Sequence, residues 1–346
     1  MSFPPYSTHG AYKVEYLWID GQGSVRGKTR VFRNPITSVD DLPEWNYDGS
    51  STGQADGNDS EVLIVPKALF NDPFRNKEGE DNHKLALCDT YLPDGSPHPT
   101  NTRVKAVERF LVQPELQPMF GIEQEFFLVE RGWPVGFPSR DSFPAPQGDY
   151  YCGTGFPHAV GRECIEKSFD RCLQAGLKLT GLNAEVAPSQ WEFQVCDYGI
   201  DVCDQLYVLR YILRRTAEEY GWDVDFEPKP VKGDWNGSGC HTNFSTKPMR
   251  EDGGYQVILD SINRLSEKHS ETMVLYGEGN QERMTGQHET ADYNVFSFGV
   301  ADRGSSIRIP RSTEANGKGY FEDRRPSSNM DPYLVTSWLY QTAGGH

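Results

Sequence analysis

Apolar positions recur along most of the chain at two spacings, and Gly- and Pro-rich stretches separate the segments that carry them. Alternating β-branched and aromatic residues predict four strands near the beginning, over residues 12–19, 28–32, 61–65 and 84–90. A turn-rich stretch with two aromatics, 45–53, lies between the second and the third. The polar, Pro-rich run 93–99 is typical of a domain linker, and after it Asn101 or Thr102 can cap a helix ending near residue 111.

The rest of the chain alternates between helical and strand-like periodicity. Helices are predicted over 161–175, 202–220 and 255–268. Strands are predicted over 178–185, 191–195, 241–245, 306–310 and 319–322. No internal repeat is visible. The pattern indicates an α+β fold of two domains.

The composition of the chain limits the kinds of molecule that the protein is expected to bind. At 346 residues the chain can bury a sizeable core, and its net charge of −16 argues against binding to a nucleic-acid backbone. No apolar run approaches the roughly 20 residues of a membrane span, and the first residues do not resemble a secretory signal. Seven cysteines without a Cys-x-x-Cys pair indicate reduced thiols. We therefore expect a cytoplasmic protein with small-molecule ligands.

The most informative segment is the apolar run 120–129, which contains Glu123 and Glu125. Side chains two residues apart on a strand point to the same face, so these carboxylates lie side by side. Like charges on a buried face are costly unless something neutralises them, and a divalent cation would do so. The alternative is an edge strand with a solvated acidic face, which the apolar flanks disfavour.

Further polar residues of the same kind occur inside apolar segments. Glu185 and Glu192 are each flanked by small or aromatic residues, His241 lies in a Gly-rich stretch, and Glu322 follows two aromatics. A single such histidine is more often structural than a ligand. Together with Glu123 and Glu125, however, these groups form an oxygen-rich set that suits Mg²⁺ or Mn²⁺ better than structural zinc.

Arginines gather near the end of this acidic chain, at positions 283, 303, 308, 311, 324 and 325. A solvated basic face is one interpretation. The other is a set of guanidinium groups that binds carboxylate and phosphate, which together with divalent metals is typical of phosphoryl transfer from ATP. Gly27-Lys28-Thr29 is not a P-loop, because position 22 is Gln rather than the required Gly.

These motifs in this order resemble glutamine synthetases of the eukaryotic (class II) type over nearly the whole chain. The segments that carry the resemblance are 45–52, 121–126, 183–193, 233–246, 284–290, 303–311 and 319–326. The resemblance implies ATP-dependent ligation of ammonia to L-glutamate through γ-glutamyl phosphate. It implies a small β-grasp N-terminal domain over 1–95 and a larger catalytic domain over 100–346. The catalytic domain would have a curved antiparallel sheet with flanking helices.

The resemblance also assigns roles to residues. Glu125, Glu185 and Glu192 would bind the metal near glutamate, and Glu123, His241 and Glu322 the metal that bridges the ATP phosphates, with two or three Mg²⁺ or Mn²⁺ ions per site. Asp48, Glu289 and Arg303 would be catalytic. The glutamate-binding residues would be Trp235, Asn236, Gly237, Arg283, Arg303 and Arg324. The ATP-binding residues would be Asn243, Phe244, Ser245, Arg303, Arg308 and Tyr320.

In this family the subunits form rings, generally two stacked pentamers, and the Asp48 loop completes a neighbour's site. Two alternatives stay open: a related γ-glutamyl amide ligase that uses another amine, and an inactive structural ring protein. The presence of Asp48 favours ammonium, and the complete ligand set disfavours an inactive relative. One departure is Asp302, which precedes Arg303 where the family usually has Asn.

Overall fold

A computed structural model of the protein describes residues 10–137, 144 and 148–344. The chain divides into two compact units. The smaller contains Met1–Val104 and Asp170–Leu177, and the larger contains Lys105–Phe169 and Lys178–His346. Within the described residues, no helix combines the length and the apolar character that crossing a membrane requires.

The smaller unit is built on a five-stranded sheet in the order β2-β1-β5-β4-β3, with β1 and β5 parallel and the other pairs antiparallel. Its strands are β1 (Tyr12–Ile19), β2 (Val25–Phe32), β3 (Trp45–Asp48), β4 (Glu61–Asn71) and β5 (Lys84–Tyr91). The four strands predicted from the sequence are therefore present.

The stretch predicted as a loop over 45–53 begins with a strand, and this part of the prediction was wrong. Tyr47 of β3 is buried and stacks on Trp18 of β1, with ring centroids 4.4 Å apart. Burial of these aromatic rings outweighs the local turn preference. A 3₁₀ turn (Gly49–Thr52) follows and presents Asp48 as its N-cap residue.

The larger unit contains a nine-stranded sheet in the order β12-β13-β14-β11-β6-β9-β8, with β7 and β10 also paired to β6. Its pairs are antiparallel except for β12 and β13. The strands are β6 (Met119–Glu130), β7 (Trp133–Pro134), β8 (Leu179–Ala184), β9 (Gln190–Tyr198), β10 (Asp223–Asp225), β11 (Cys240–Ser245), β12 (Phe298–Val300), β13 (Ile307–Ile309) and β14 (Phe321–Asp323).

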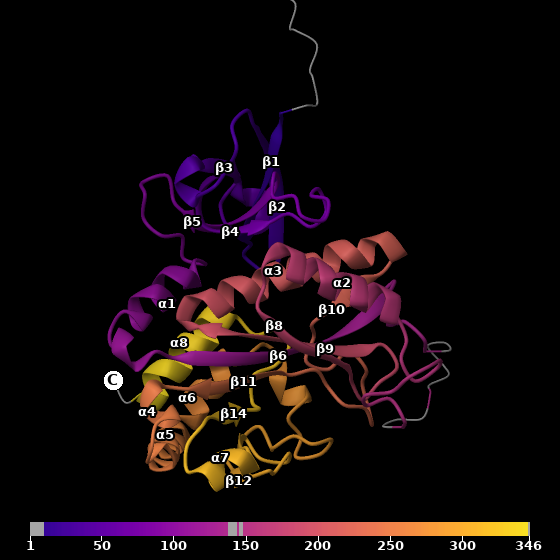
Figure 1. Ribbon diagram of the computed structural model, residues 1–346, viewed down its shortest axis with the longest axis vertical. Helices are drawn as coiled ribbons and strands as arrows, with labels where there is room; N and C mark the ends of the chain where they lie inside the picture. The colour runs from indigo at the N-terminus through magenta and orange to yellow at the C-terminus, as the bar shows by residue number, and fades with distance from the viewer. Residues whose placement is uncertain (1–9, 138–143, 145–147, 345–346) are drawn as a thin grey trace, which may run out of the picture. The chain divides into compact units, whose positions relative to one another are not determined.

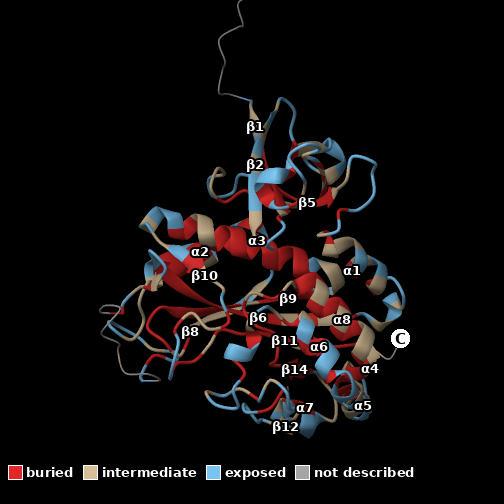
Figure 2. Ribbon diagram, turned by 180° about the vertical axis from the view of Figure 1, so that it is seen from behind, coloured by how far each residue is buried: buried red, intermediate tan, exposed pale blue. Residues whose placement is uncertain are grey.

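Helices flank this sheet (Figure 1), as expected for the α+β class. The long helix α3 packs on β6 and β9 and against α8, and Figure 2 shows it buried over most of its length. The helices are α1 (Thr102–Phe110), α2 (Arg162–Ala175), α3 (Gly199–Ala217), α4 (Lys247–Arg250), α5 (Gly254–Glu267), α6 (His269–Leu275), α7 (Arg311–Asn316) and α8 (Pro332–Gly344). Of these, α4, α6, α7 and α8 were not predicted from the sequence.

The central strand β6 is held from behind by a buried arginine. Arg210 on α3 donates from Nε to Gln124 Oε1 at 2.8 Å, and its other nitrogens donate to the backbone oxygens of Met330 and Ser328 at 3.0 Å. Because alternate residues of a strand point to opposite faces, this contact leaves Glu123 and Glu125 on the other face.

Candidate active site

Two groups of three side chains lie next to each other on one face of the larger sheet. In each group the three ligand-type atoms lie within 4.8 Å of one another. The groups are Glu123, His241 and Glu322, and Glu125, Glu185 and Glu192. The central strand β6 contributes one carboxylate to each group, so the spacing of two residues noticed in the sequence positions both.

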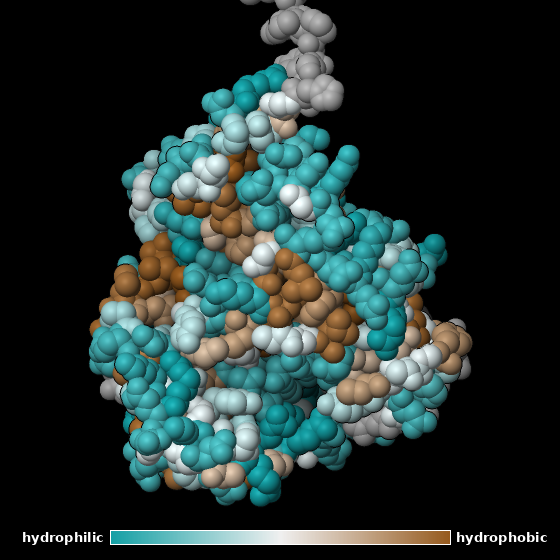
Figure 3. Space-filling view, in the orientation of Figure 1, coloured by the Kyte–Doolittle hydropathy of each residue, from teal (hydrophilic) through white to brown (hydrophobic). Residues whose placement is uncertain are grey.

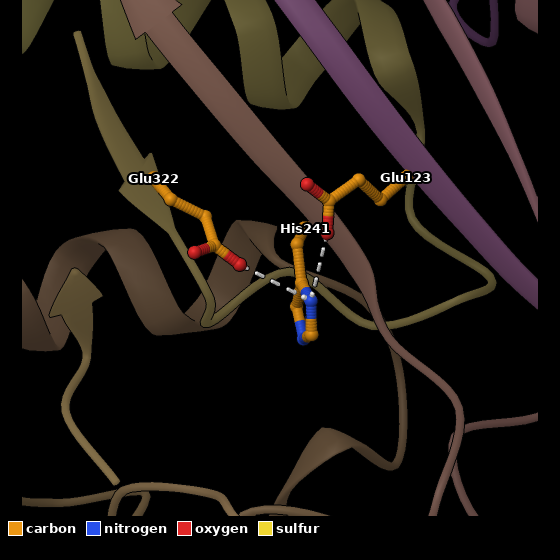
Figure 4. Close-up of side chains that lie close together, drawn as sticks. All are labelled: Glu123, His241 and Glu322. Atoms are coloured by element: carbon orange, nitrogen blue, oxygen red, sulfur yellow. Dashed lines mark ion pairs between the residues drawn. The ribbon is translucent and has the colours of Figure 1, made fainter. Parts of the chain in front are cut away.

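The first group, shown in Figure 4, comes from three adjacent strands, β6, β11 and β14. His241 pairs in register with Glu123, and its Nδ1 lies 3.5 Å from an oxygen of Glu123 and 3.5 Å from an oxygen of Glu322. Figure 4 shows the three side chains pointing toward one another. Strand pairing therefore assembles residues that are about 200 positions apart in the chain.

The second group comes from β6, β9 and the end of β8. Glu125 and Glu192 are directly opposite in the β6–β9 register, and Glu185 follows the last residue of β8. Like charges directly opposite on neighbouring strands are destabilising. All three carboxylates are buried, so the sheet concentrates negative charge where water cannot screen it.

Neutral donors hold these carboxylates in place. Asn183 Nδ2 donates to Glu185 Oε1 at 2.9 Å, and Gln194 Nε2 donates to Glu192 Oε1 at 2.7 Å. The backbone N–H of Gly239 donates to Glu125 Oε2 at 2.9 Å. A Cβ at Gly239 would lie 2.7 Å from His241 Nε2, so this position requires glycine for the close approach.

Burial and mutual repulsion disfavour ionisation of the second group. Burial raises the pKa of Glu125 to about 7. Burial, followed by the charges of Glu123 and Glu125, raises the pKa of Glu192 to about 8. Burial and the neighbouring carboxylates also hold the pKa of Glu185 well above its usual value. Three crowded carboxylates, each with a neutral hydrogen-bond donor, match the oxygen ligands of a hard divalent cation.

The first group also suits a cation. Burial, together with the charge of Arg324, holds the pKa of His241 well below its usual value, so the imidazole is neutral and able to coordinate a metal. Glu322 is fully buried; Arg308 Nε lies 2.5 Å from its Oε2, but this oxygen accepts no well-aligned hydrogen bond from the described residues. Both groups therefore have the chemistry of a divalent metal site.

The stability of the protein is expected to respond to metal more strongly at high pH. Carboxylates whose pKa is raised by folding favour the folded state below about pH 4.5 and lose that contribution as pH rises through about 7 to 8. A bound cation replaces the lost protons, so Mg²⁺ or Mn²⁺ should raise the melting temperature more near pH 8.5 than near pH 6.

Differential scanning fluorimetry at both pH values, with and without cation, checks this expectation. The matched control is Glu185→Gln/Glu192→Gln, which removes two of the charges and should reduce the difference between the two pH values. An equal shift at both pH values in the unmodified protein would contradict it.

The two groups face a cavity of about 250 Å³ whose wall carries four guanidinium groups, those of Arg283, Arg303, Arg308 and Arg324. The cavity thus combines acidic side chains at the sheet with basic side chains around them. The surface of the larger unit is largely hydrophilic in the lower part of Figure 3, and it is hollowed there. Such a cavity favours a polar, charged ligand.

The arginines are held by different partners. Arg324 NH1 donates to Glu322 Oε1 at 2.8 Å. Arg283 is buried and donates to three backbone oxygens of residues 324–326 and to Asn280, and burial lowers its pKa to about 10. Arg303 is half-exposed and pairs with Glu289. All four guanidinium groups therefore have a partner in this structure, counting Arg308 with Glu322, and Arg303 is the most exposed of them.

Glu289 lies on a loop over residues 285–292 that we call the flap. An isolated bridge joins Thr285 to Asp292 at its base. Glu289 Oε2 lies 2.8 Å from Arg303 NH2, and the backbone oxygen of Glu289 accepts a hydrogen bond from Arg324 NH2 at 3.2 Å. The flap therefore places a carboxylate at the rim of the cavity.

The structure brings most of the predicted site residues to this cavity, but not all. Its wall contains the six metal-ligand candidates, Asn236, Gly237, Glu289 and the four arginines. The described lining leaves out Trp235, Asn243, Phe244, Ser245 and Tyr320. Trp235 packs in a core with Phe137, and Phe244 packs between Phe120 and Phe321. Asn243 instead donates to Glu123 Oε1 at 2.8 Å.

Two further acidic residues were singled out in the sequence. Asp48 belongs to the smaller unit; its carboxylate accepts hydrogen bonds from Ser50 Oγ and Ser50 N at 2.6 and 3.0 Å, and the serine hydroxyl chiefly lowers its pKa. Asp302, beside Arg303, accepts from Ser305 Oγ and from the N–H of Gly304, which lower its pKa. The Asp302 carboxylate therefore stabilises the local turn over residues 302–305.

Several residues of the wall were not identified from the sequence: Tyr151, Asn183, Val186, Gln194, His288 and Thr290. For two of them, the sequence contains a pattern from which their position could have been predicted. Asn183 precedes Glu185 by two positions and Gln194 follows Glu192 by two, so the period of a strand puts each on the face of its carboxylate. Tyr151, which lies under the Arg303 guanidinium at 5.5 Å, had no such signal.

Comparison with known proteins agrees with this geometry. The family described as "Glutamine synthetase, catalytic domain" matches residues 98–344. The chain belongs to the glutamine synthetase family. It is 54% identical to a glutamine synthetase cytosolic isozyme of Medicago sativa and 53% identical to cytosolic isozyme 1-1 of Oryza sativa subsp. japonica. Each alignment covers 95% of this chain and 93% of the relative.

A glutamine synthetase nodule isozyme of Lupinus luteus is 52% identical over the same share of the chain. The similarity extends through both units of the structure, so family membership does not rest on the catalytic region alone. These relatives are glutamine synthetases of the eukaryotic type, which is the type that the motifs of the sequence resemble.

Proposed function

We propose that the protein ligates ammonia to L-glutamate at the expense of ATP, giving L-glutamine, ADP and phosphate through γ-glutamyl phosphate. The observation that carries this proposal is the pair of three-ligand groups on one sheet face, with four arginines around the same cavity. Family membership supports the same reaction. A site of this kind suits a reaction in which a phosphoryl group is transferred from a triphosphate to a carboxylate.

The metal sites are assigned to the two groups. Glu125, Glu185 and Glu192 would hold the cation near glutamate, and Glu123, His241 and Glu322 the cation near the ATP phosphates, as Mg²⁺ or Mn²⁺ with two or three ions per site. Bound cations neutralise the carboxylates and the phosphate oxygens. The residues themselves orient the ligands, because Asn183, Gln194 and the backbone N–H of Gly239 donate hydrogen bonds to the carboxylates.

Substrate contacts are assigned to the arginines and to the rim. Arg283, Arg303 and Arg324, with the stretch Trp235-Asn236-Gly237, would bind glutamate and the transferring phosphate. The nucleotide would be bound by Asn243, Phe244, Ser245, Arg303, Arg308 and Tyr320, although the ring of Phe244 lies in the core.

Proton transfer is assigned to two carboxylates. Asp48 would bind ammonium, for which its lowered pKa is suited because the carboxylate stays ionised and attracts the cation, and it would take up the proton that ammonium loses. Glu289 would accept a proton from the tetrahedral adduct and, with the flap, exclude water from the acyl phosphate. Arg303 would stabilise charge on the phosphate.

The quaternary arrangement is proposed from family membership. Residues 1–95 would form a β-grasp domain, for which the parallel pairing of β1 and β5 at the centre of the sheet gives support, and 100–346 the catalytic domain. Two pentameric rings would form a decamer in which Asp48 serves a neighbouring subunit. We assign the enzyme to the cytoplasm, as for the cytosolic isozymes that it resembles.

Phosphate release tests the reaction directly. With ATP and Mg²⁺, release should require both glutamate and ammonium, and one glutamine should form per phosphate. Release with methylamine or ethanolamine but not ammonium would instead identify a related amide ligase. A folded, metal-loaded oligomer that releases no phosphate with any amine would overturn the proposed activity and leave a structural protein.

A further inference from the structure

The flap meets the loop that precedes the glutamate-pocket residues through a charged contact. His288 Nε2 lies 3.0 Å from Asp234 Oδ1. The carboxylate is 82% exposed, whereas the imidazole is only 16% exposed. Asp234 is the neighbour of Trp235 in the stretch 235–237, and His288 is the neighbour of Glu289. The contact therefore connects two segments of the larger unit that are 54 positions apart in the chain and that both continue into the wall of the cavity.

The backbone of the flap is in an uncommon conformation at this point. His288 has φ of 52° and Glu289 has φ of 61°, so two consecutive residues with side chains adopt the left-handed region. Each such residue costs free energy and persists only where its surroundings hold it. The side chain of Thr290 bridges to the backbone oxygens of Gln287 and Arg283, at 2.8 and 3.2 Å, which closes the turn.

Three contacts then hold the flap against the body of the unit. Asp234 holds the His288 ring, Arg303 holds the Glu289 carboxylate, and Arg324 holds the Glu289 backbone oxygen. The two arginines are also assigned to the substrates, so their hold on the flap changes when substrates bind. The contact of Asp234 does not involve a substrate-binding group.

His288 lies between two cavities, and its contact with Asp234 keeps its ring in the wall that separates them. His288 lines the central cavity and also lines an outer cavity of about 540 Å³, whose other wall residues include Asp234, Lys229 and Gln287. The imidazole is thus part of the wall between the reaction cavity and an outer hollow. Movement of this ring away from Asp234 would open a path between the two.

We propose that Asp234 is a positioning residue of the flap: its carboxylate holds the His288 ring, and through it keeps Glu289 and the cavity wall in place while the acyl phosphate exists. This inference rests on the proposed ligase function. Asp234 touches no reacting atom, so its role is to keep water out rather than to transfer a proton.

The chemical consequence of a loose flap is a futile hydrolysis. The oxygen of a water molecule attacks the γ-carbonyl carbon of γ-glutamyl phosphate, and the bond from that carbon to the phosphate oxygen breaks. Glutamate and inorganic phosphate result, and the water proton is released to solvent. ATP is then consumed without formation of glutamine, so the ratio of glutamine to phosphate reports the closure of the flap.

The test compares Asp234→Ala with Asp234→Asn at saturating glutamate, ammonium, ATP and Mg²⁺. Asp234→Ala should lower the ratio of glutamine formed to phosphate released by about 1.5-fold to fivefold, the usual effect of losing one ion pair whose carboxylate is exposed to solvent. Asp234→Asn should retain most of the ratio, because the amide keeps an oxygen of the same reach beside His288 Nε2. A purely structural role would raise KM for glutamate but leave the ratio unchanged.

The matched control is Asp252→Ala, which removes an exposed carboxylate from a pair with Lys318 Nζ at 2.6 Å elsewhere in the same unit. This variant should keep the ratio of the unmodified enzyme. The double variant Asp234→Ala/His288→Gln should have the same ratio of glutamine to phosphate as His288→Gln alone, because both changes remove the same contact.

A second readout does not depend on turnover. Hydrogen exchange of the amides of residues 285–292 should be faster in Asp234→Ala than in Asp252→Ala. If neither flap exchange nor the ratio changes in a folded Asp234→Ala, the positioning role is wrong. If the unmodified protein forms no glutamine, the proposed function is wrong, and flap exchange alone then decides whether Asp234 holds the flap.

Discussion

Replacement of Glu289 by alanine is expected to slow glutamine formation by roughly 10²–10⁴-fold, the usual contribution of a positioned proton acceptor. Glu289 lines the central cavity from the flap, and its carboxylate lies 2.8 Å from Arg303 NH2. The change removes the carboxylate and also releases Arg303. The variant keeps Arg303 itself, and the other residues assigned to the nucleotide are on the sheet and on other loops, so ATP binding should remain largely intact.

Glutamine formation at saturating substrates, together with calorimetric titration of the nucleotide, measures the two effects separately. The informative companion is Glu289→Gln, which keeps the size of the side chain and an oxygen beside Arg303 but cannot accept a proton. Both variants should be slow if proton transfer matters, whereas only the alanine variant should be slow if the contact with Arg303 matters. Unchanged turnover in both would remove Glu289 from the mechanism.

The local part of this site could be predicted because strand geometry is local. The spacing of Glu123 and Glu125 in an apolar run predicts a strand with two carboxylates on one face, and β6 has this arrangement. The distance between Glu123 and Glu322 depends instead on the register of β6 with β11 and of β11 with β14. Pairing between strands so distant in the chain has no local signal.

There are physical reasons why the sequence did not indicate some of the elements. Helix α8 is mostly buried, and its polar and apolar residues are not separated onto opposite faces, so it shows no amphipathic stripe. Strand β3 is only four residues long and is stabilised by the stacking of Tyr47 on Trp18 rather than by its own propensity. The left-handed residues His288 and Glu289 are ordinary in sequence, and only the fold imposes their conformation.

The assignment of side chains to the cavity was limited in the same way. Motif resemblance identifies Trp235 and Phe244 as part of the site region, but the structure shows both rings packed in apolar cores. In contrast, Asn183 and Gln194 are in the cavity because they share a strand face with Glu185 and Glu192. Position in a motif therefore predicts the neighbourhood of a residue, while strand period predicts the direction of its side chain.

The second large effect is expected from His241→Ala. His241 contributes the nitrogen ligand of the first group and lies 3.5 Å from oxygens of both Glu123 and Glu322. Its neutral imidazole would be replaced by a gap between two carboxylates. Because loss of even an outer partner of a metal ligand costs about 10- to 100-fold in affinity, binding of the metal–nucleotide complex should weaken by roughly 100-fold or more.

The complementary variant is Glu192→Gln in the second group, whose carboxylate lies directly opposite Glu125. If the two groups serve different ligands, His241→Ala should weaken metal–ATP more than glutamate, and Glu192→Gln should do the reverse. Calorimetric titration of both ligands into both variants gives the four affinities needed. Equal losses in all four would mean that the six residues act as one cluster, and a reversed pattern would exchange the two metal assignments, because each group would then serve the ligand now given to the other.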